Sequence, residues 1–323
     1  MNAARESGDL VTALDGHVER RPKASLSSAA AFGGRWLVRL LVLLLLVVVV
    51  RVLVTSKTIH WSTVSHYLTV NEILVGVRRT LELTAIGMAI GIILGVVLAL
   101  MRMSSSVLMN GASSLYLWFF RGTPLLVQIL FFYNLALFLP RISLGVPFGG
   151  PTFASWSTNS LIAPFTAGAL ALGLNQGAYM CEIVRAGILS VDEGQLEASH
   201  ALGMTRGQAM RRIILPQAMP VIIPPTGNNA IALLKDSSLV SVISILDLLG
   251  AVQLISSANF ATVPLLVVAS IWYLVMTTVA SVGQYYLERH FGRGSTRNAP
   301  PTMLQRIGAN ATAILRPGAR PTV

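Results

Sequence analysis

The sequence is poor in cysteine, in lysine and in charge of either sign. It contains one cysteine, and 11% of its 323 residues are charged, where soluble domains average about 25%. The lone Cys181 excludes an intramolecular disulfide and a cysteine-built metal site, and its apolar neighbours favour inert packing. Because 54% of the residues are hydrophobic and the mean hydropathy is +0.68, the composition indicates an integral membrane protein.

The sequence also lacks the motifs of a nucleotide site or a catalytic centre. A phosphate-binding loop ends in Gly-Lys-Ser or Gly-Lys-Thr, and none of the three lysines follows a glycine. There is no Gly-x-Ser-x-Gly motif and no cluster of histidines or carboxylates at metal-ligand spacing. We therefore expect no catalysis, no cofactor and no metal in this chain.

The net charge of +11 raises the question of nucleic-acid binding. The basic residues are spread among apolar runs, however, and do not form a patch interleaved with aromatic residues. We expect membrane lipid as a partner and no nucleic acid.

Six apolar runs are candidates for membrane-spanning helices. They cover residues 36–54, 73–101, 113–139, 161–189, 213–234 and 264–287. The first run resembles the core of a signal peptide, but no small-residue cleavage site follows it, so we interpret it as an extra membrane helix. Residues 1–35 are expected to form a disordered tail, residues 288–323 a basic tail, and 140–160 a loop rich in Gly, Pro and Ser.

Positive charge is divided unequally between the two sides of this arrangement. With six spans both termini lie on one side, which carries 18 of the 24 Lys and Arg residues and leaves six for the other. Because cytoplasmic loops carry the excess of positive charge, both termini and the segment around residues 190–212 are expected in the cytoplasm.

Two spans have features of their own. The second holds Gly87, Gly91 and Gly95 at intervals of four, a ridge that lets helices pack closely. The fifth contains four prolines, which suits a helix beside protein or a water-filled cavity, although proline is also common in membrane helices generally. We place this span along a polar pathway, with Asn228 as a candidate residue.

The fifth span ends in a polar group made up of Lys235, Asp236, Ser237 and Ser238. Ionic side chains are costly in lipid, so they need partners or a polar cavity. Two interpretations remain open. The group contacts a substrate or forms a gate, or Lys235 and Asp236 mark the outer interface. The apolar stretch 239–255 that follows is too short to be assigned as a crossing.

The most polar segment between two apolar runs extends from about Asp192 to Pro216. Asp192 and Thr205 are each followed three residues later by glutamine, as at helix starts, and Gly203 is placed to end the first of two short helices. The first helix would present a small, apolar face suited to a partner's groove. That face consists of Ala198, Ala201 and Leu202.

This segment resembles the EAA loop of permease subunits of bacterial ABC importers. The family pattern is E-A-A, three residues, G, nine residues, I, one residue, L-P. The chain matches six of its seven fixed positions and has Ser199 in place of an alanine. The matching residues are Glu197, Ala198, Gly203, Ile213, Leu215 and Pro216. Residues 178–185 resemble the family's run that leads into this loop, and residues 120–124 and 234–239 resemble the polar amino-acid branch of the family.

The resemblance covers residues 73–287 and implies an all-α transmembrane domain of a type I importer in the bacterial plasma membrane. It implies a polar amino acid of the histidine, glutamine, glutamate and arginine group as substrate. It also implies a separate ATPase subunit that binds ATP and Mg and receives the loop, an extracytoplasmic solute-binding protein, and a second permease half that is either a copy or a sister chain.

A rival interpretation is an ion-coupled secondary transporter or channel, which needs no ATPase. Such a protein would be expected to carry carboxylates near midspan and an internal repeat, and neither is evident here. A membrane enzyme is a weaker option because no catalytic cluster is present.

Overall fold

The structure is a computed structural model that describes residues 26–56, 58–145 and 151–291. It divides after Ile59 into two units, which are considered separately. The two predicted tails lie largely outside the described residues.

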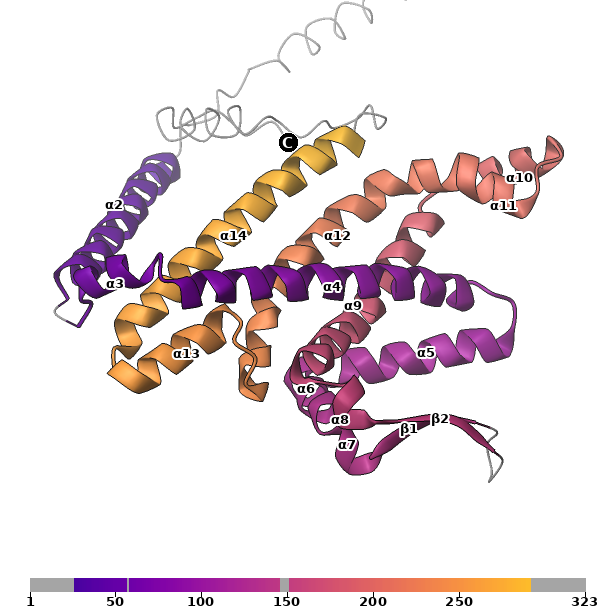
Figure 1. Cartoon of the computed structure of the whole chain (residues 1–323). Coiled ribbons are helices and arrows are strands. Elements are labelled where there is room, and N and C mark those ends of the chain that lie inside the picture. Colours follow the sequence, from indigo (N-terminus) through magenta and orange to yellow (C-terminus); the bar gives the residue numbers. More distant parts are fainter. Residues whose placement is uncertain (1–25, 57, 146–150, 292–323) are drawn as a thin grey trace, which may run out of the picture. The chain divides into compact units, whose positions relative to one another are not determined.

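The first unit contains one long helix, α2 (Leu26–Thr55), shown in Figure 1. Its large apolar side chains from Leu37 to Val52, and that of Val54, are exposed, as expected for a helix that faces lipid. The assignment of residues 1–35 to a disordered tail is wrong for 26–35, which belong to α2. The alanines at 29–31 favour this helical start.

The second unit is almost entirely helical, which confirms the predicted fold class. Its elements follow in the order α3 (Trp61–Tyr67), α4 (Asn71–Arg102), α5 (Val107–Gly122), α6 (Leu125–Tyr133), α7 (Leu135–Phe138), β1 (Arg141–Gly145), β2 (Thr152–Ser157), α8 (Thr158–Leu161), α9 (Pro164–Leu189), α10 (Glu193–Ala201), α11 (Arg206–Ala209), the π-helix η1 (Met210–Ile214), α12 (Leu215–Asp236), the 3-10 helix η2 (Ser237–Ile243), α13 (Leu248–Asn259) and α14 (Thr262–Phe291).

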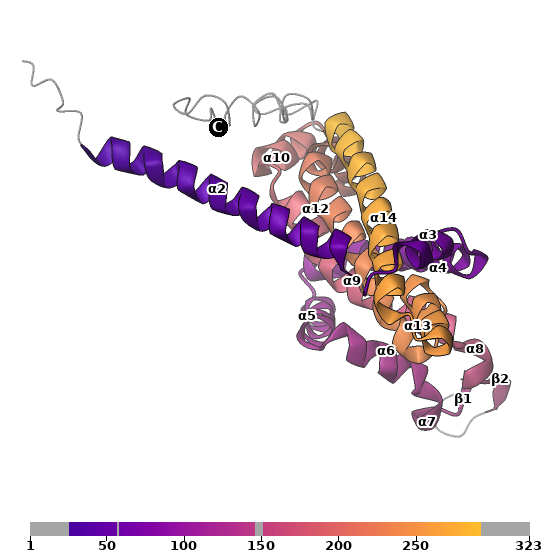
Figure 2. The same ribbon diagram turned by 90° about the vertical axis from the view of Figure 1, so that its left-hand side faces the viewer.

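Among the described residues, α4 and α14 are each long and apolar enough to cross a membrane. Two bent pairs raise the number to four if each pair is one span. They are α5 with α6, at 102°, and the helix Arg206–Ile243 with α13, at 44°. The expected span at 161–189 contains the helix α9 (Pro164–Leu189), but α9 is not among these candidate spans. Asn175 and Gln176 in its middle lower its mean hydropathy. In both Figure 1 and Figure 2, α10 lies at one end of this unit and α13 at the other.

The run 113–139 is not one straight helix. It breaks between α5 and α6, where Thr123 has extended backbone angles and Pro124 precedes the first residue of α6. The proline ring disfavours helical geometry in the preceding residue, which explains the position of the break.

The segment 140–160, expected to be a loop, contains an antiparallel hairpin of β1 and β2. Ile142 pairs with Trp156 and Ser143 with Ser155. Alternating apolar and polar residues in both strands match the period of a β-strand, a signal that the loop-like composition concealed. The stretch 239–255, left unassigned, forms η2 and the start of α13, whose first amides at Leu249 and Gly250 donate to the Asp247 carboxylate.

The glycine ridge of α4 packs against α9, as predicted. Gly87 lies against Leu172, Gly91 against Gln176 and Gly95 against Met180. Glycines of α9 reciprocate, with Gly173 against Ile90. The close approach leaves Cys181 buried between the helices as a free thiol, in agreement with its expected packing role.

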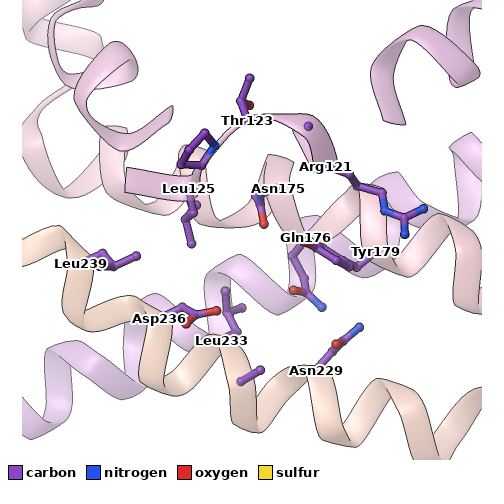
Figure 3. A pocket seen from close by; sticks show the side chains of 13 residues that line it. Arg121, Thr123, Leu125, Asn175, Gln176, Tyr179, Asn229, Leu233, Asp236 and Leu239 are labelled. Carbon is purple, nitrogen blue, oxygen red and sulfur yellow. The ribbon is translucent and has the colours of Figure 1, made fainter. Parts of the chain in front are cut away.

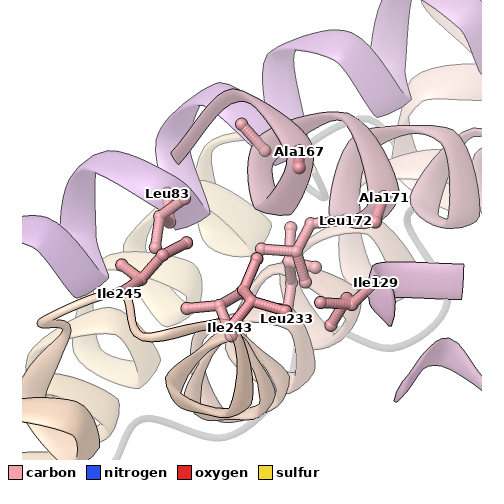
Figure 4. Packing of buried hydrophobic residues seen from close by; sticks show 10 residues of the cluster. Leu83, Ile129, Ala167, Ala171, Leu172, Leu233, Ile243 and Ile245 are labelled. Atoms are coloured by element: carbon pink, nitrogen blue, oxygen red, sulfur yellow. The ribbon is translucent and has the colours of Figure 1, made fainter. Parts of the chain in front are cut away.

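A second apolar cluster joins five segments of the chain, as Figure 4 shows. It contains Leu83 of α4, Ile129 of α6, Leu172 of α9, Leu233 of α12 and Ile243 of η2. This cluster fixes the end of α12 against the break between α5 and α6.

Candidate functional site

The loop that resembles the EAA motif folds as the sequence predicted. The Asp192 carboxylate accepts a hydrogen bond from the Gly194 amide at 2.7 Å and so caps α10. Gly203 follows the helix with φ of 75°, in the left-handed region that favours glycine. A cap and a glycine therefore set the two ends of α10.

The second helix of the loop begins with a complete capping box. The Thr205 hydroxyl accepts from the Gln208 amide at 3.4 Å, and the Gln208 side chain accepts from the Thr205 amide at 2.9 Å. The helix then continues through η1 into α12 without a break. In the wide turn of η1 the Leu215 amide donates to the carbonyl of Met210, and the next residue, Pro216, has no amide to donate.

The predicted docking face of α10 is open to its surroundings. Ala198, Ala201 and Leu202 are exposed, and the Leu202 side chain is 81% exposed. Ser199 is buried, and its hydroxyl donates to the Leu196 carbonyl at 2.6 Å. The serine that departs from the family pattern therefore points inward and leaves the exposed face small and apolar. Of the other motif residues, Glu197 and Pro216 are exposed, whereas Ile213 and Leu215 are half-buried.

A cavity of about 610 Å³ lies between the break after α5, the middle of α9 and the end of α12. Figure 3 shows its lining. The polar members are Arg121, Thr123, Asn175, Gln176, Tyr179, Asn229 and Asp236. In Figure 3 the Arg121 side chain extends away from the centre of the cavity, whereas Gln176, Asn229 and Asp236 surround it.

Amide side chains satisfy the carbonyls that are exposed where α5 ends. Gln128 donates to the Phe120 carbonyl at 2.9 Å and to the Thr123 hydroxyl at 2.7 Å. Asn175 of α9 donates to the same Phe120 carbonyl at 3.0 Å and to the Gln128 oxygen at 3.1 Å. Because helix ends leave carbonyls without partners, this network stabilises the broken helix that forms one wall of the cavity.

Two polar groups at the cavity have no such partners among the described residues. The Gln176 side chain is 5% exposed, and its Nε2 has no hydrogen-bond partner there. Asp236 forms no salt bridge there. The cavity thus offers an unused donor and an unpaired carboxylate.

The structure divides the candidate residues at the end of α12. Asp236 lines the cavity, whereas Asn228, Lys235, Ser237 and Ser238 do not. Asn228 accepts a hydrogen bond from Gln284 of α14 at 3.0 Å. Ser237 is buried, and its hydroxyl donates to the Leu234 carbonyl at 2.8 Å. Lys235 is exposed and Ser238 is half-buried.

The sequence analysis missed Asn175, Gln176 and Asn229 as lining residues. Helical spacing could have found one of them, because Asn229 and Asp236 are seven residues apart and share a face of α12. No local signal indicates the two α9 residues, since they reach the cavity through the packing of α9.

Comparison with known proteins decides the family. A profile described as binding-protein-dependent transport system inner membrane component matches residues 91–293. The chain belongs to this family. Within it the permease is similar to the arginine transport system permease protein ArgU of Corynebacterium glutamicum, with 43% identity over 91% of this chain and 92% of that one.

The permease is also similar to the L-cystine transport system permease protein TcyB of Bacillus subtilis, with 36% identity over 68% of this chain and 86% of the relative. Among solved structures, an amino acid ABC transporter crystallised with histidines matches at 38% identity and a TM-score of 0.57. That match covers 68% of this chain and 94% of the other. The permease is therefore the multi-pass membrane component of an ABC transporter, and the secondary-transporter interpretation gains no support.

Proposed function

We propose that this chain moves a cationic amino acid into the cell through the cavity beside Asp236, powered by ATP hydrolysis in a separate subunit. One observation supports the proposal most directly. The Asp236 carboxylate, which forms no salt bridge among the described residues, and the Gln176 amide, which has no hydrogen-bond partner there, line the same cavity.

This pair matches the two charges of an amino acid. An ammonium group donates to the Asp236 carboxylate, and a substrate carboxylate accepts from the amide groups of Gln176 and Asn229. A volume of about 610 Å³ lies within the range of small-molecule sites. Both ends of a zwitterion thus find partners in the cavity.

The positions of the charges in the cavity favour basic over acidic substrates. Among the described residues, Asp236 is the only acidic member of the lining. Arg121 is its only basic member, and the Arg121 side chain extends away from the centre of the cavity toward Glu182, at 3.5 Å. A second positive charge on the substrate is therefore attracted and a second negative charge repelled. The relative named for arginine transport agrees with this preference.

The exposed face of Ala198, Ala201 and Leu202 is the proposed contact with the ATPase subunit, which binds ATP and Mg. An extracytoplasmic solute-binding protein delivers the substrate on the opposite side, where α13 lies. A second permease half, a copy or a sister chain, completes the pathway in the bacterial plasma membrane.

Uptake in vesicles that contain the permease, its ATPase subunit and the binding protein tests the proposal. Asp236→Asn removes one charge and should lower arginine uptake roughly tenfold or more, because charged hydrogen bonds contribute about 1.5–3 kcal/mol. Glu72→Gln, which removes a carboxylate charge in the exposed first turn of α4 outside the cavity lining, should leave uptake near normal.

Unchanged arginine kinetics in Asp236→Asn would contradict the assignment of the cavity. Accumulation driven by an ion gradient without the ATPase subunit would contradict the ATP-driven mechanism as a whole. ATPase activity is measured with and without the permease in each variant. Activity that depends on both subunits shows that the complex has assembled, so that a change in uptake is not caused by failed assembly.

A further inference from the structure

Three guanidinium groups converge on one carboxylate at a second position in the permease. The Glu182 carboxylate of α9 forms ion pairs with Arg102 at 3.1 Å, with Arg121 at 3.5 Å and with Arg185 at 3.3 Å. Glu182 and Arg185 lie three residues apart on one helix. The additional arginines come from the ends of α4 and α5.

This cluster contains three positive charges and one negative charge, so its net charge is +2. No other acidic side chain in the described part of the chain forms a salt bridge with these arginines. The Arg102 and Arg121 side chains are 28% and 46% exposed, so they remain accessible. Arg121 also lies 5.7 Å from the centre of the Tyr179 ring.

A pocket of about 530 Å³ opens beside the cluster. Its lining combines the charged groups Arg102, Arg121 and Glu182 with the Ser114 hydroxyl and the Trp118 indole. Trp118 is 73% exposed. One wall of the pocket is therefore cationic and hydrogen-bonding, and the other is aromatic and apolar.

The position of the pocket is the cytoplasmic side of the membrane region. Arg102 is the last residue of α4, and α9 passes from Glu182 to its end at Leu189, just before the cytoplasmic loop. Exposed Leu115, at 64%, extends the apolar surface of Trp118 along α5. Tryptophan is enriched at membrane interfaces, and basic pockets between helices on this side suit phosphate-bearing headgroups.

We propose that Arg102 and Arg121 bind a phosphate group beside Trp118. An anionic phospholipid of the cytoplasmic leaflet supplies this chemistry with its acyl chains against Trp118 and Leu115, and soluble phosphate supplies it without them. Guanidinium groups bind phosphate through paired hydrogen bonds, and the surplus charge of the cluster leaves donors for this purpose.

Fluorescence quenching of the full-length permease in vesicles tests the proposal. The vesicles consist of phosphatidylcholine with a minor fraction of brominated lipid, whose headgroup is either phosphatidylglycerol or phosphatidylcholine. The signal of Trp118 is the difference between the permease and its Trp118→Phe variant. Brominated phosphatidylglycerol should quench this signal more strongly, with a preference of about fivefold for each arginine that contributes.

Arg102→Gln should reduce that preference, and Arg102→Lys, which keeps the charge, should retain most of it. Arg211→Gln, a cytoplasmic arginine outside the cluster, is the matched control and should have no effect. Glu182 keeps two guanidinium partners in the Arg102 variants, and circular dichroism verifies their helix content.

Absence of both a phosphatidylglycerol preference and a response to soluble phosphate in the unaltered permease would overturn the proposal. An unchanged preference in Arg102→Gln, or an equal loss in Arg211→Gln, would also overturn it. A parallel titration in pure phosphatidylcholine vesicles compares sodium phosphate with sodium chloride at equal ionic strength. A Trp118 response to phosphate that Arg102→Gln abolishes assigns the pocket to soluble phosphate, and a response to the lipid alone assigns it to the membrane.

Discussion

Gly91 of α4 and Gln176 of α9 are in direct contact, and a β-carbon at position 91 would lie 2.6 Å from Cγ of Gln176. The small-residue ridge therefore does more than bring two helices together. It also holds in place a side chain that lines the cavity.

Gly91→Ala should displace Gln176 and lower uptake, because overpacking a close helix contact costs about 1–3 kcal/mol. The measurement is uptake at matched permease abundance. Gly111→Ala is the control, since no atom lies within 4 Å of a β-carbon at that position. Normal uptake in Gly91→Ala would mean that the α4 contact does not control the position of Gln176.

Gly203→Val should uncouple the permease from its ATPase subunit. Valine resists the φ of 75° that ends α10, at a cost of roughly 1 kcal/mol or more, so the docking face is misdirected. Uptake and ATPase co-purification should fall while membrane abundance is unchanged. Gly207→Val, in the same loop without a positive φ, is the control.

Ala201→Asp probes the docking face of α10 by placing a negative charge on it. The loop has no coupling role if Gly203→Val and Ala201→Asp both transport normally.

Single cysteines should label from opposite sides of the membrane. With Cys181 replaced by alanine, a cysteine at Ser155 in β2 should react with an impermeant maleimide on intact cells. A cysteine at Gly207 should react only after the cells are disrupted, because the excess of positive charge places the loop in the cytoplasm. Labelling of both positions on intact cells would refute this topology.

Gln128→Leu should destabilise the break between α5 and α6. The change removes the donor shared by Phe120 and Thr123. The Phe120 carbonyl keeps Asn175 as a donor, but the Thr123 carbonyl loses its side-chain partner, and an unsatisfied polar group costs about 1–3 kcal/mol when it is buried. Thermal unfolding in detergent should begin several degrees lower. The exposed Gln253→Leu is the matched control. Equal midpoints in the two variants would show that Asn175 alone satisfies the helix end.

Local signals were sufficient for the loop that resembles the EAA motif. The caps at Asp192 and Thr205 and the end at Gly203 depend on residues within one or two turns, so the sequence contains everything that fixes them. The same holds for the close packing of Gly87, Gly91 and Gly95, whose spacing is itself the signal.

Features formed by distant segments were not predictable in this way. The hairpin depends on two strands finding each other across a turn, and the cavity combines α5, α9 and α12. Pro124 did carry a signal for the broken helix, but the apolar length of the run outweighed it. Asn228 and Asp236 were grouped because both are polar and near in sequence, yet Asn228 contacts Gln284 of α14 whereas Asp236 lines the cavity.

The absence of a break between the loop and α12 has a mechanical consequence. At about 1.5 Å per residue, the stretch from Arg206 to Asp236 forms a rod roughly 45 Å long, so a tilt of about 5° at the loop end displaces the other end by roughly 4 Å. A displacement of that size exceeds the length of a hydrogen bond. A partner that merely rocks the loop can therefore withdraw the Asp236 carboxylate from a bound ammonium group without unfolding any helix.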